Sequence, residues 1–484
     1  MSNSIFWYDF ETTGIDPRRD RPLQVAGVRT DEDLQEIGEP LRIDCQLAED
    51  VLPHPIACQI TGIGPDRVRA GLPEAQFMQM LHEQMAVPGT CTAGYNNLRF
   101  DDEMTRFALY RNYFDPYGRE WQGGNSRWDL LDALRTAHAL RPDGINWPQQ
   151  DGFTSLRLEL LTAANGIEHG QAHDALADVR ATIAMARLLK QAQPRLYQYL
   201  YNLRGKHQVS AMVDLQQVRP LVHVSGRFGR DRHGLAVVLP LGWHPRNRNA
   251  LIVWDLQVDP HLLEQVPAGQ LRELLYTRSE DLEAGQRRPG LKLVHINKCP
   301  VLADTKVLRA QDIERLRLDM PVLQERAHWL AQWREQGQDV LAQVYAEREI
   351  DGTYALTADA EIQLYDGFIP DRDRNLLQGI RQAEGARLTL ADWPLTDQRL
   401  ADMLPRYRAR NFPESLSQAQ RQEWLAFCRQ RLTGEVPGAT LTYEGFLFEL
   451  DRVSVDASDE QRELLQQWRR YADELAVKLG MISK

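Results

Sequence analysis

The sequence predicts an α/β fold for its first part, followed by a small β-rich domain and a C-terminal helical domain. The chain has 484 residues, which is too long for one hydrophobic core, so several domains are expected. Strand-like and helix-like segments alternate up to about residue 193, as they do in layered α/β folds. Short strands between turn residues follow, and a helical pattern begins near residue 351. We therefore predict domains over 1–193, 194–350 and 351–484.

The first domain is predicted to open with a buried strand over 5–11, which is short, rich in aromatic residues and bounded by Thr-Gly. Further strands are expected over 23–29, 41–47 and 90–95. Apolar residues at helical spacing predict helices over 73–85, 100–113, 128–140, 155–164 and 174–190. Pro194 is expected to end the last of these helices, because proline cannot continue a helix.

The later domains show different patterns. Turn residues separate the short strands that we expect over 220–226, 234–240, 250–256 and 292–296. The C-terminal helical pattern is clearest over 460–479, where apolar residues recur on one face of a helix.

Composition is typical of a soluble globular protein, with 43% hydrophobic and 26% charged residues. No apolar run reaches the roughly 20 residues that cross a bilayer, and the first ten residues lack a signal-peptide pattern. The five cysteines are scattered, odd in number and never arranged as Cys-x-x-Cys. This argues against a disulfide framework or a zinc site and favours a cytoplasmic protein.

The net charge of −11 neither supports nor excludes a nucleic-acid substrate, because binding depends on local clusters of charge. A single cluster of arginines is more often a solvated face than a binding site. Arginines gather at four places: Arg18, Arg19 and Arg21; Arg227, Arg230 and Arg232; Arg246 and Arg248; Arg406, Arg408 and Arg410.

Two acidic residues, Asp9 and Glu11, lie in the first predicted strand. Side chains two apart on a strand share a face, so both carboxylates are expected to point the same way. Neighbouring carboxylates repel each other unless a cation neutralises them, and hard divalent cations such as Mg²⁺ prefer carboxylate oxygens. Taken alone, the pair is equally consistent with an acidic strand end exposed to solvent.

Two further segments carry acidic residues. Asp101 and Asp102 fall at the start of a predicted helix, where the helix dipole favours acids whatever their function. Asp174 is a suitable N-cap for the helix over 174–190, and Asp178 lies one turn inside it beside apolar positions. His173 immediately precedes that helix.

Together these segments resemble the DEDD exonuclease superfamily in its histidine subclass. The matching motifs are Asp-x-Glu at 9–11, Asn-x-x-Phe-Asp at 97–101 and His-x-x-x-x-Asp at 173–178. The tyrosine subclass would have a tyrosine where Asp174 stands, so the histidine subclass is favoured. The superfamily places its aspartate directly after the phenylalanine, which favours Asp101 over Asp102 as the equivalent residue.

The chain is also similar to the bacterial exonuclease I family along nearly its whole length. Similar segments lie at 8–14, 20–22, 26–31, 94–103, 125–132, 140–148, 220–226, 294–301 and 407–413. This resemblance implies a ribonuclease-H-like exonuclease domain, an SH3-like domain and a helical C-terminal domain. It also implies 3′-to-5′ hydrolysis of single-stranded DNA to 5′-mononucleotides, in DNA repair and recombination, by a monomer.

The resemblance further implies a site that holds two Mg²⁺ ions, with Mn²⁺ as an alternative. Asp9 would bridge both ions, Glu11 and Asp178 would complete one shell, and Asp101 would help to hold the other. His173 would act as the general base, which suits its unperturbed pKa of about 6.5.

A partner is implied as well: the acidic, hydrophobic C-terminal tail of the single-stranded-DNA-binding protein. Such a tail needs an arginine for its terminal carboxylate and an apolar pocket for a ring. Arg141 is the arginine that we predict, and Tyr199 is expected to help line the pocket. Arg141 is equally consistent with capping the preceding helix, since basic residues favour helix C-termini.

Three alternatives remain open from the sequence, and the weakest is a polymerase proofreading subunit, because no polymerase-binding segment is recognisable. An RNA exonuclease of the same subclass would leave roughly 290 residues unexplained, since those chains are short. A non-catalytic single-stranded-DNA-binding scaffold would have no need of the four acids and the histidine.

Overall fold

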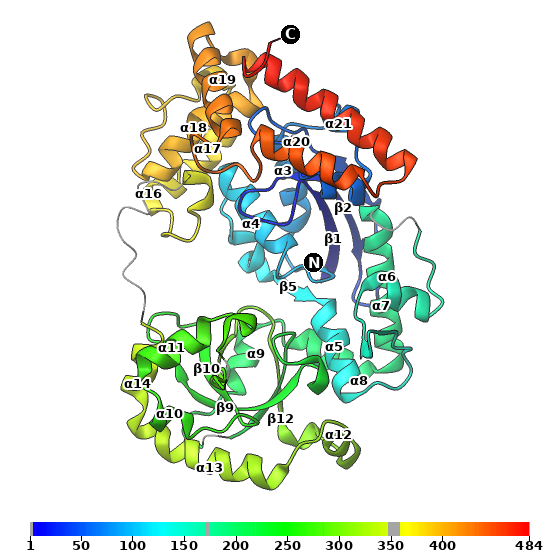
Figure 1. The fold of residues 1–484 in the computed structure, drawn as a ribbon, viewed down its shortest axis with the longest axis vertical. Helices are drawn as coiled ribbons and strands as arrows, with labels where there is room; N and C mark the ends of the chain where they lie inside the picture. Colours follow the sequence, from blue (N-terminus) through cyan, green and yellow to red (C-terminus); the bar gives the residue numbers. More distant parts are fainter. Residues whose placement is uncertain (1–2, 171–173, 218, 284, 347–358, 484) are drawn as a thin grey trace. The chain divides into compact units, whose positions relative to one another are not determined.

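The computed structural model describes residues 3–170, 174–217, 219–283, 285–346 and 359–483 (Figure 1). His173 therefore lies outside the described residues. The chain divides into two compact units. One comprises residues 1–126, 169–183 and 351–484, and the other comprises residues 127–168 and 184–350.

The sheet of the first unit has the strand order β3-β2-β1-β4-β5. Its middle strand, β1 (Ser4–Thr12), runs antiparallel to β2 (Pro22–Thr30) and parallel to β4 (Thr90–Gly94). β3 (Leu41–Asp44) pairs with β2, and β5 (Ser126–Asp129) ends the order. Every residue of β1 except Asp9 is buried. This burial accords with the mostly apolar and aromatic composition of the strand.

The two faces of β1 have different surroundings. Phe6, Tyr8 and Phe10 share a core with residues of α3 (Glu74–Met85) and α4 (Asp101–Arg111). Because side chains alternate along a strand, Asp9 and Glu11 project from the opposite face. The first turn of α7 (Ala175–Ala192) places Asp178 beside them.

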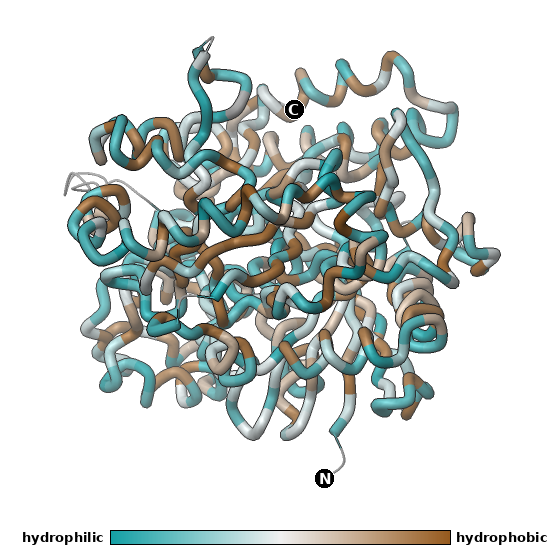
Figure 2. The backbone as a smooth tube through the Cα atoms, turned by 90° about the horizontal axis from the view of Figure 1, so that it is seen from below, coloured by the Kyte–Doolittle hydropathy of each residue, from teal (hydrophilic) through white to brown (hydrophobic). Residues whose placement is uncertain are grey.

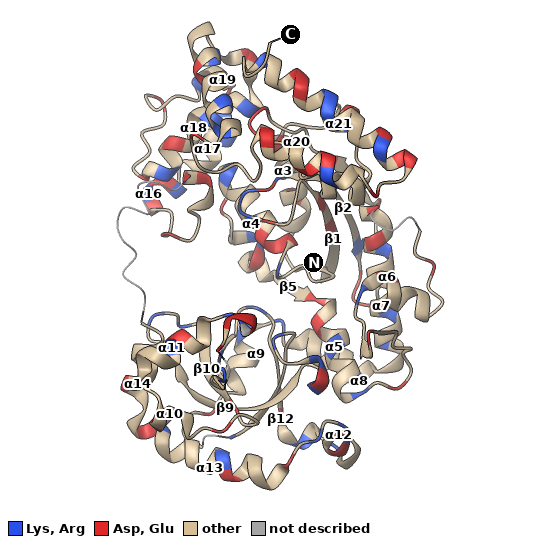
Figure 3. Cartoon of the chain, in the orientation of Figure 1, with Lys and Arg blue, Asp and Glu red and all other residues tan. Residues whose placement is uncertain are grey.

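The C-terminal helices of the first unit share hydrophobic cores with its N-terminal part. Cys58 of α1 (Pro55–Thr61) packs in one cluster with residues of α19 (Gln418–Thr433), α20 (Tyr443–Ser454) and α21 (Asp459–Lys478). Phe107 and Tyr110 of α4 pack in another with residues of α18 (Gln398–Asn411). Acidic and basic residues are interspersed along α21 (Figure 3).

Buried ion pairs also join these parts of the first unit. Asp50 accepts hydrogen bonds from Arg410 at 2.6 Å and Arg431 at 3.0 Å, and Glu361 lies 2.7 Å from Arg410. Arg21 pairs with Glu361 as well. Burial alone would raise the pKa of Asp50, but Arg410 and Arg431 outweigh it and lower the pKa to about 2. Arg21 and Arg410, which belong to two of the basic clusters in the sequence, are therefore used inside the protein.

The second unit contains an antiparallel sheet with the order β11-β10-β9-β8-β12. Its strands are β8 (Leu221–Val224), β9 (Leu235–Trp243), β10 (Ala250–Asp255), β11 (Leu291–His295) and β12 (Val301–Asp304). The first four agree with the predicted strands, whereas β12 was not predicted.

The helix predicted over 128–140 begins only at Leu130, because Trp128 belongs to β5.

The chain leaves α7 at Ala192, two residues before Pro194, and Pro194 then begins α8 (Pro194–Asn202). Proline suits a first helical turn, where its missing N–H needs no partner. Other helices of the second unit are α5 (Leu130–Leu140), α6 (Leu158–Ala164), α9 (Lys206–Ala211), α10 (Leu262–Gln265), α11 (Ala268–Tyr276), α12 (Ala310–Arg315), α13 (Met320–Gln336) and α14 (Gln338–Val344). Among the described residues, the first unit also contains α2 (Pro65–Arg69), α16 (Asp371–Arg374) and α17 (Leu377–Gln382).

Hydrophobic and hydrophilic residues alternate along the helices (Figure 2). Among the described residues, no helix combines the length and the apolar character needed to span a membrane.

Candidate active site

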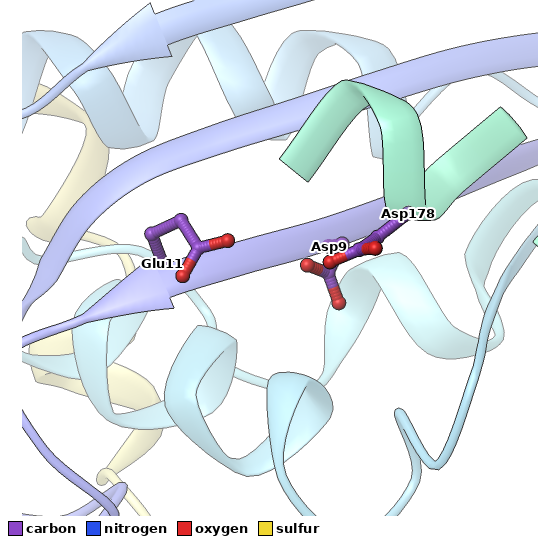
Figure 4. A group of neighbouring side chains, drawn as sticks. All are labelled: Asp9, Glu11 and Asp178. Atoms are coloured by element: carbon purple, nitrogen blue, oxygen red, sulfur yellow. The ribbon is translucent and has the colours of Figure 1, made fainter. Parts of the chain in front are cut away.

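Three carboxylates meet on the face of β1 opposite Tyr8 and Phe10. Asp9 and Glu11 come from the strand, and Asp178 comes from the first turn of α7 (Figure 4). One carboxylate oxygen from each residue lies within 4.8 Å of the other two. The structure thus brings together three of the four acids that the sequence singles out as ligands.

The group is electrostatically strained without a cation. Burial raises the pKa of Asp9 well above its usual value, and the charges of Asp101 and Asp178 raise it further. Burial, followed by the charges of Asp9 and Asp178, raises the pKa of Glu11 to about 9. A bound cation would relieve this repulsion. The donor set consists of oxygens only, which fits a hard divalent ion.

Asp101 and Asp102, although adjacent, have different surroundings. Asp101 is the first residue of α4, and its Oδ1 accepts the backbone N–H of Phe10 at 3.2 Å. Asp102 accepts the Tyr8 hydroxyl and the Arg119 guanidinium, both at 2.7 Å. Tyr8 and Asp9 project from opposite faces of β1, so Asp101 is the one that lies beside Asp9, in agreement with its effect on the pKa of Asp9.

The segment before α7 contains a histidine that the sequence analysis did not single out. His169 Nε2 lies 2.5 Å from Asp178 Oδ1. No local pattern marks His169, which is nine residues before Asp178. Asp174 accepts the N–H groups of Leu176 and Ala177 at 3.1 and 3.2 Å, as expected for the N-cap of α7.

Arg141 and Tyr199 both belong to the second unit. Arg141 ends α5, and its guanidinium donates to Leu140 O at 2.5 Å, Val307 O at 2.9 Å and Asp312 Oδ2 at 3.3 Å. The capping interaction therefore exists, and links to Val307, before α12, and to Asp312, within α12, accompany it. The Tyr199 hydroxyl donates to Leu302 O at 2.6 Å, and 38% of the residue is exposed.

Aromatic residues that could stack on DNA bases are mostly used in packing. Trp128 and Tyr407 are 2% and 3% exposed, respectively. Phe412 packs edge-on against Tyr407, and the Trp147 indole donates to Pro142 O at 2.9 Å. Trp128 and Tyr407 are therefore core residues.

A mixed sheet whose middle strand presents Asp-x-Glu to an aspartate on a neighbouring helix defines an exonuclease of the ribonuclease-H-like class. Residues 6–186 match the family model named Exonuclease. Residues 204–347 match the exonuclease I SH3-like domain, and residues 358–475 match the exonuclease I C-terminal domain. The chain belongs to the exonuclease I family.

Relatives match along the whole chain. Exodeoxyribonuclease I of Escherichia coli is 45% identical over 479 residues, which are 98% of each protein. The crystal structure of E. coli exonuclease I in complex with a dA16 oligonucleotide has a TM-score of 0.91 at 44% identity, covering 98% of this chain and 100% of that one. A zinc-bound form of the E. coli enzyme with single-stranded DNA has the same TM-score, identity and coverage. The predicted family and the predicted fold class are confirmed.

Proposed function

We propose that this exodeoxyribonuclease hydrolyses single-stranded DNA from the 3′ end and releases 5′-mononucleotides, in DNA repair and recombination. The observation that carries the proposal is the Asp9–Glu11–Asp178 group, set in a chain that is similar to exodeoxyribonuclease I over its whole length. That length also disfavours a short RNA exonuclease, and the strained carboxylate group disfavours a non-catalytic scaffold. Five free cysteines accord with a cytoplasmic location, and we expect a monomer.

Each site residue has a proposed role. Asp9, Glu11, Asp178 and Asp101 would hold divalent ions, which we propose to be two Mg²⁺ with Mn²⁺ as an alternative. When bound, such ions supply charge stabilisation at the attacking and leaving oxygens. His173 would accept a proton from the attacking water. Metal dependence in this family accords with the zinc-bound form of the E. coli enzyme.

Digestion of end-blocked oligonucleotides tests the proposal. With Mg²⁺, a single strand with a free 3′ end should yield mononucleotides whether or not its 5′ end is blocked. A 3′-blocked strand should persist, EDTA should stop the reaction, and a matched RNA strand should be degraded far more slowly. Digestion of the 3′-blocked strand, or equal rates on RNA and DNA, would contradict the proposal.

We further propose that Arg141 binds the terminal carboxylate of the single-stranded-DNA-binding protein's tail, with Tyr199 beside it. Arg141→Ala is then expected to weaken binding of a tail peptide at least about tenfold, since a charged hydrogen-bonded pair contributes about 1.5–3 kcal/mol. Activity on bare DNA should be unchanged. The melting temperature should fall slightly under either interpretation, because Arg141 also donates to Leu140 and Val307. Calorimetric titration with the peptide is therefore the deciding measurement.

Arg315→Ala is the matched control for this experiment. Arg315 donates to Ala139 O, at the same end of α5, and lies 3.8 Å from the same Asp312 carboxylate. Its loss should disturb the helix end to a similar degree and leave the peptide affinity intact. If Arg141→Ala binds the tail peptide like the wild type, Arg141 is a helix cap and does not bind the partner.

A further inference from the structure

A buried polar network lies directly behind the carboxylate group. Tyr8, the residue before Asp9, points into the core on the opposite face of β1. Its hydroxyl donates to Asp102 Oδ1 at 2.7 Å, and Arg119 Nη2 donates to the same oxygen at 2.7 Å. The exposed fractions of Tyr8, Asp102 and Arg119 are 1%, 0% and 1%. We refer to these three residues as the rear network.

The rear network fixes the start of α4 against β1. Two consecutive residues of α4 each hold the strand: Asp101 accepts the Phe10 N–H at 3.2 Å, and Asp102 accepts the Tyr8 hydroxyl. The pairing of β4 with β1 ends where Ala93 lies opposite Trp7. Asp101 contacts β1 just past that point, at the N–H of Phe10. Neighbouring residues of a helix point about 100° apart, so two such attachments restrict both the rotation and the position of the helix.

Arg119 extends the network to a third segment. It comes from the turn at Gly118–Glu120, and its Nη1 donates to Thr92 Oγ1 of β4 at 3.1 Å. Asp102 is thereby a buried carboxylate with a buried cationic partner. A buried ion pair loses much of its stabilisation when one partner shifts, because the other is left uncompensated in a low-dielectric interior. A displacement of α4 would therefore separate Asp102 from Arg119 and leave charge uncompensated in the interior.

We propose that Tyr8, Asp102 and Arg119 are positioning residues that hold Asp101 beside Asp9 and so set the spacing of the metal-binding carboxylates. The inference rests on the proposed function, since it requires Asp9 and Asp101 to bind metal. Tyr8 connects Asp9 and Asp101 directly. It precedes Asp9 in β1, and its hydroxyl donates to Asp102, the residue after Asp101. The rear network is buried and therefore acts on the site only through these neighbours.

Tyr8→Phe removes the hydroxyl and keeps the ring. Groups that orient metal ligands typically contribute about 10–100-fold to metal affinity or activity. We expect Tyr8→Phe to raise the Mg²⁺ dissociation constant, measured by calorimetry, and the Mg²⁺ concentration for half-maximal activity about tenfold. The KM for single-stranded DNA should stay unchanged, because the rear network orders the metal-binding carboxylates and is not proposed to bind the DNA. Asp102→Ala should have a larger effect, and Asp102→Asn, which keeps an acceptor oxygen, should restore part of it.

Tyr110→Phe is the matched control. Tyr110 lies on the same helix, is fully buried, and donates its hydroxyl to Ala360 O at 3.1 Å. Its replacement should lower the melting temperature without changing the Mg²⁺ dependence. The proposal is overturned if Tyr8→Phe behaves like Tyr110→Phe, with a lower melting temperature and wild-type Mg²⁺ affinity.

Two further comparisons keep the result interpretable. If Tyr8→Phe does not fold, the difference in Mg²⁺ affinity between Asp102→Asn and the wild type decides, and its absence overturns the proposal. Asp9→Ala separates this inference from the proposed function. An active Asp9→Ala contradicts the ligand assignment itself, whereas an inactive Asp9→Ala together with wild-type metal affinity in Tyr8→Phe contradicts only the positioning role.

Discussion

Asp9→Ala is expected to lower kcat on single-stranded DNA at least about a hundredfold, a loss of about 3 kcal/mol in transition-state stabilisation. In the carboxylate group, one oxygen of Asp9 lies within 4.8 Å of oxygens of Glu11 and Asp178. After burial, the charges of Asp101 and Asp178 are the causes that raise its pKa, so it faces both of them. Without Asp9 the other acids lose their common neighbour. Single-turnover hydrolysis of a labelled strand measures the effect, and Asp178→Ala should behave similarly.

The fold should survive this replacement, because removing one of several mutually repelling carboxylates relieves strain. In EDTA, the melting temperature of Asp9→Ala should equal or exceed that of the wild type. Mg²⁺ should raise the melting temperature of the wild type but not that of Asp9→Ala. A ligand stabilises a protein only if it binds the folded state, and Asp9→Ala is expected to have lost the metal site. Asp44→Ala, which removes the β3 carboxylate paired with Arg67, is the control and should keep kcat. If Asp9→Ala keeps more than about a hundredth of the wild-type kcat, Asp9 is not an essential ligand.

The shared face of Asp9 and Glu11 could be predicted from local periodicity, whereas their association with Asp178 was an implication of the resemblance to the exonuclease superfamily. Alternation along a strand fixes the relation between Asp9 and Glu11, and helical geometry places Asp178 one turn after the N-cap. The choice between Asp101 and Asp102 has no such local basis, since both are acids in a first turn. It depends on Tyr8 and Arg119, whose side chains reach Asp102 from other segments.

The buried ion pairs illustrate the same limit. In the sequence, the arginines near residue 410 resemble a basic surface patch. Their partner Asp50 is 360 residues away from Arg410, so no spacing rule connects the two. The strand β12 was missed for another reason: at four residues it is too short to show clear alternation. Long-range pairing, rather than propensity, creates both features.

His173→Ala is expected to lower kcat by a factor of about 10² to 10⁴, the range for a lost general base, with metal binding retained. The expectation derives from the motif His-x-x-x-x-Asp at 173–178. In the wild type, the rate should fall as the pH drops through the histidine pKa, near 6.5 if unperturbed, because the protonated imidazole cannot accept a proton. This acidic limb should be absent in the variant. Rate profiles between about pH 5 and 9 at saturating Mg²⁺ test the role.

His169 provides the comparison that makes this test selective, because its ring lies 2.5 Å from Asp178. If His173 is the base, His169→Ala should keep the acidic limb and change mainly the Mg²⁺ dependence, through the orientation of Asp178. The opposite result, an acidic limb lost in His169→Ala and kept in His173→Ala, would assign the base to His169. Calorimetric titration with Mg²⁺ separates the two variants independently of turnover: His173→Ala should bind the ion like the wild type, and His169→Ala should bind it more weakly.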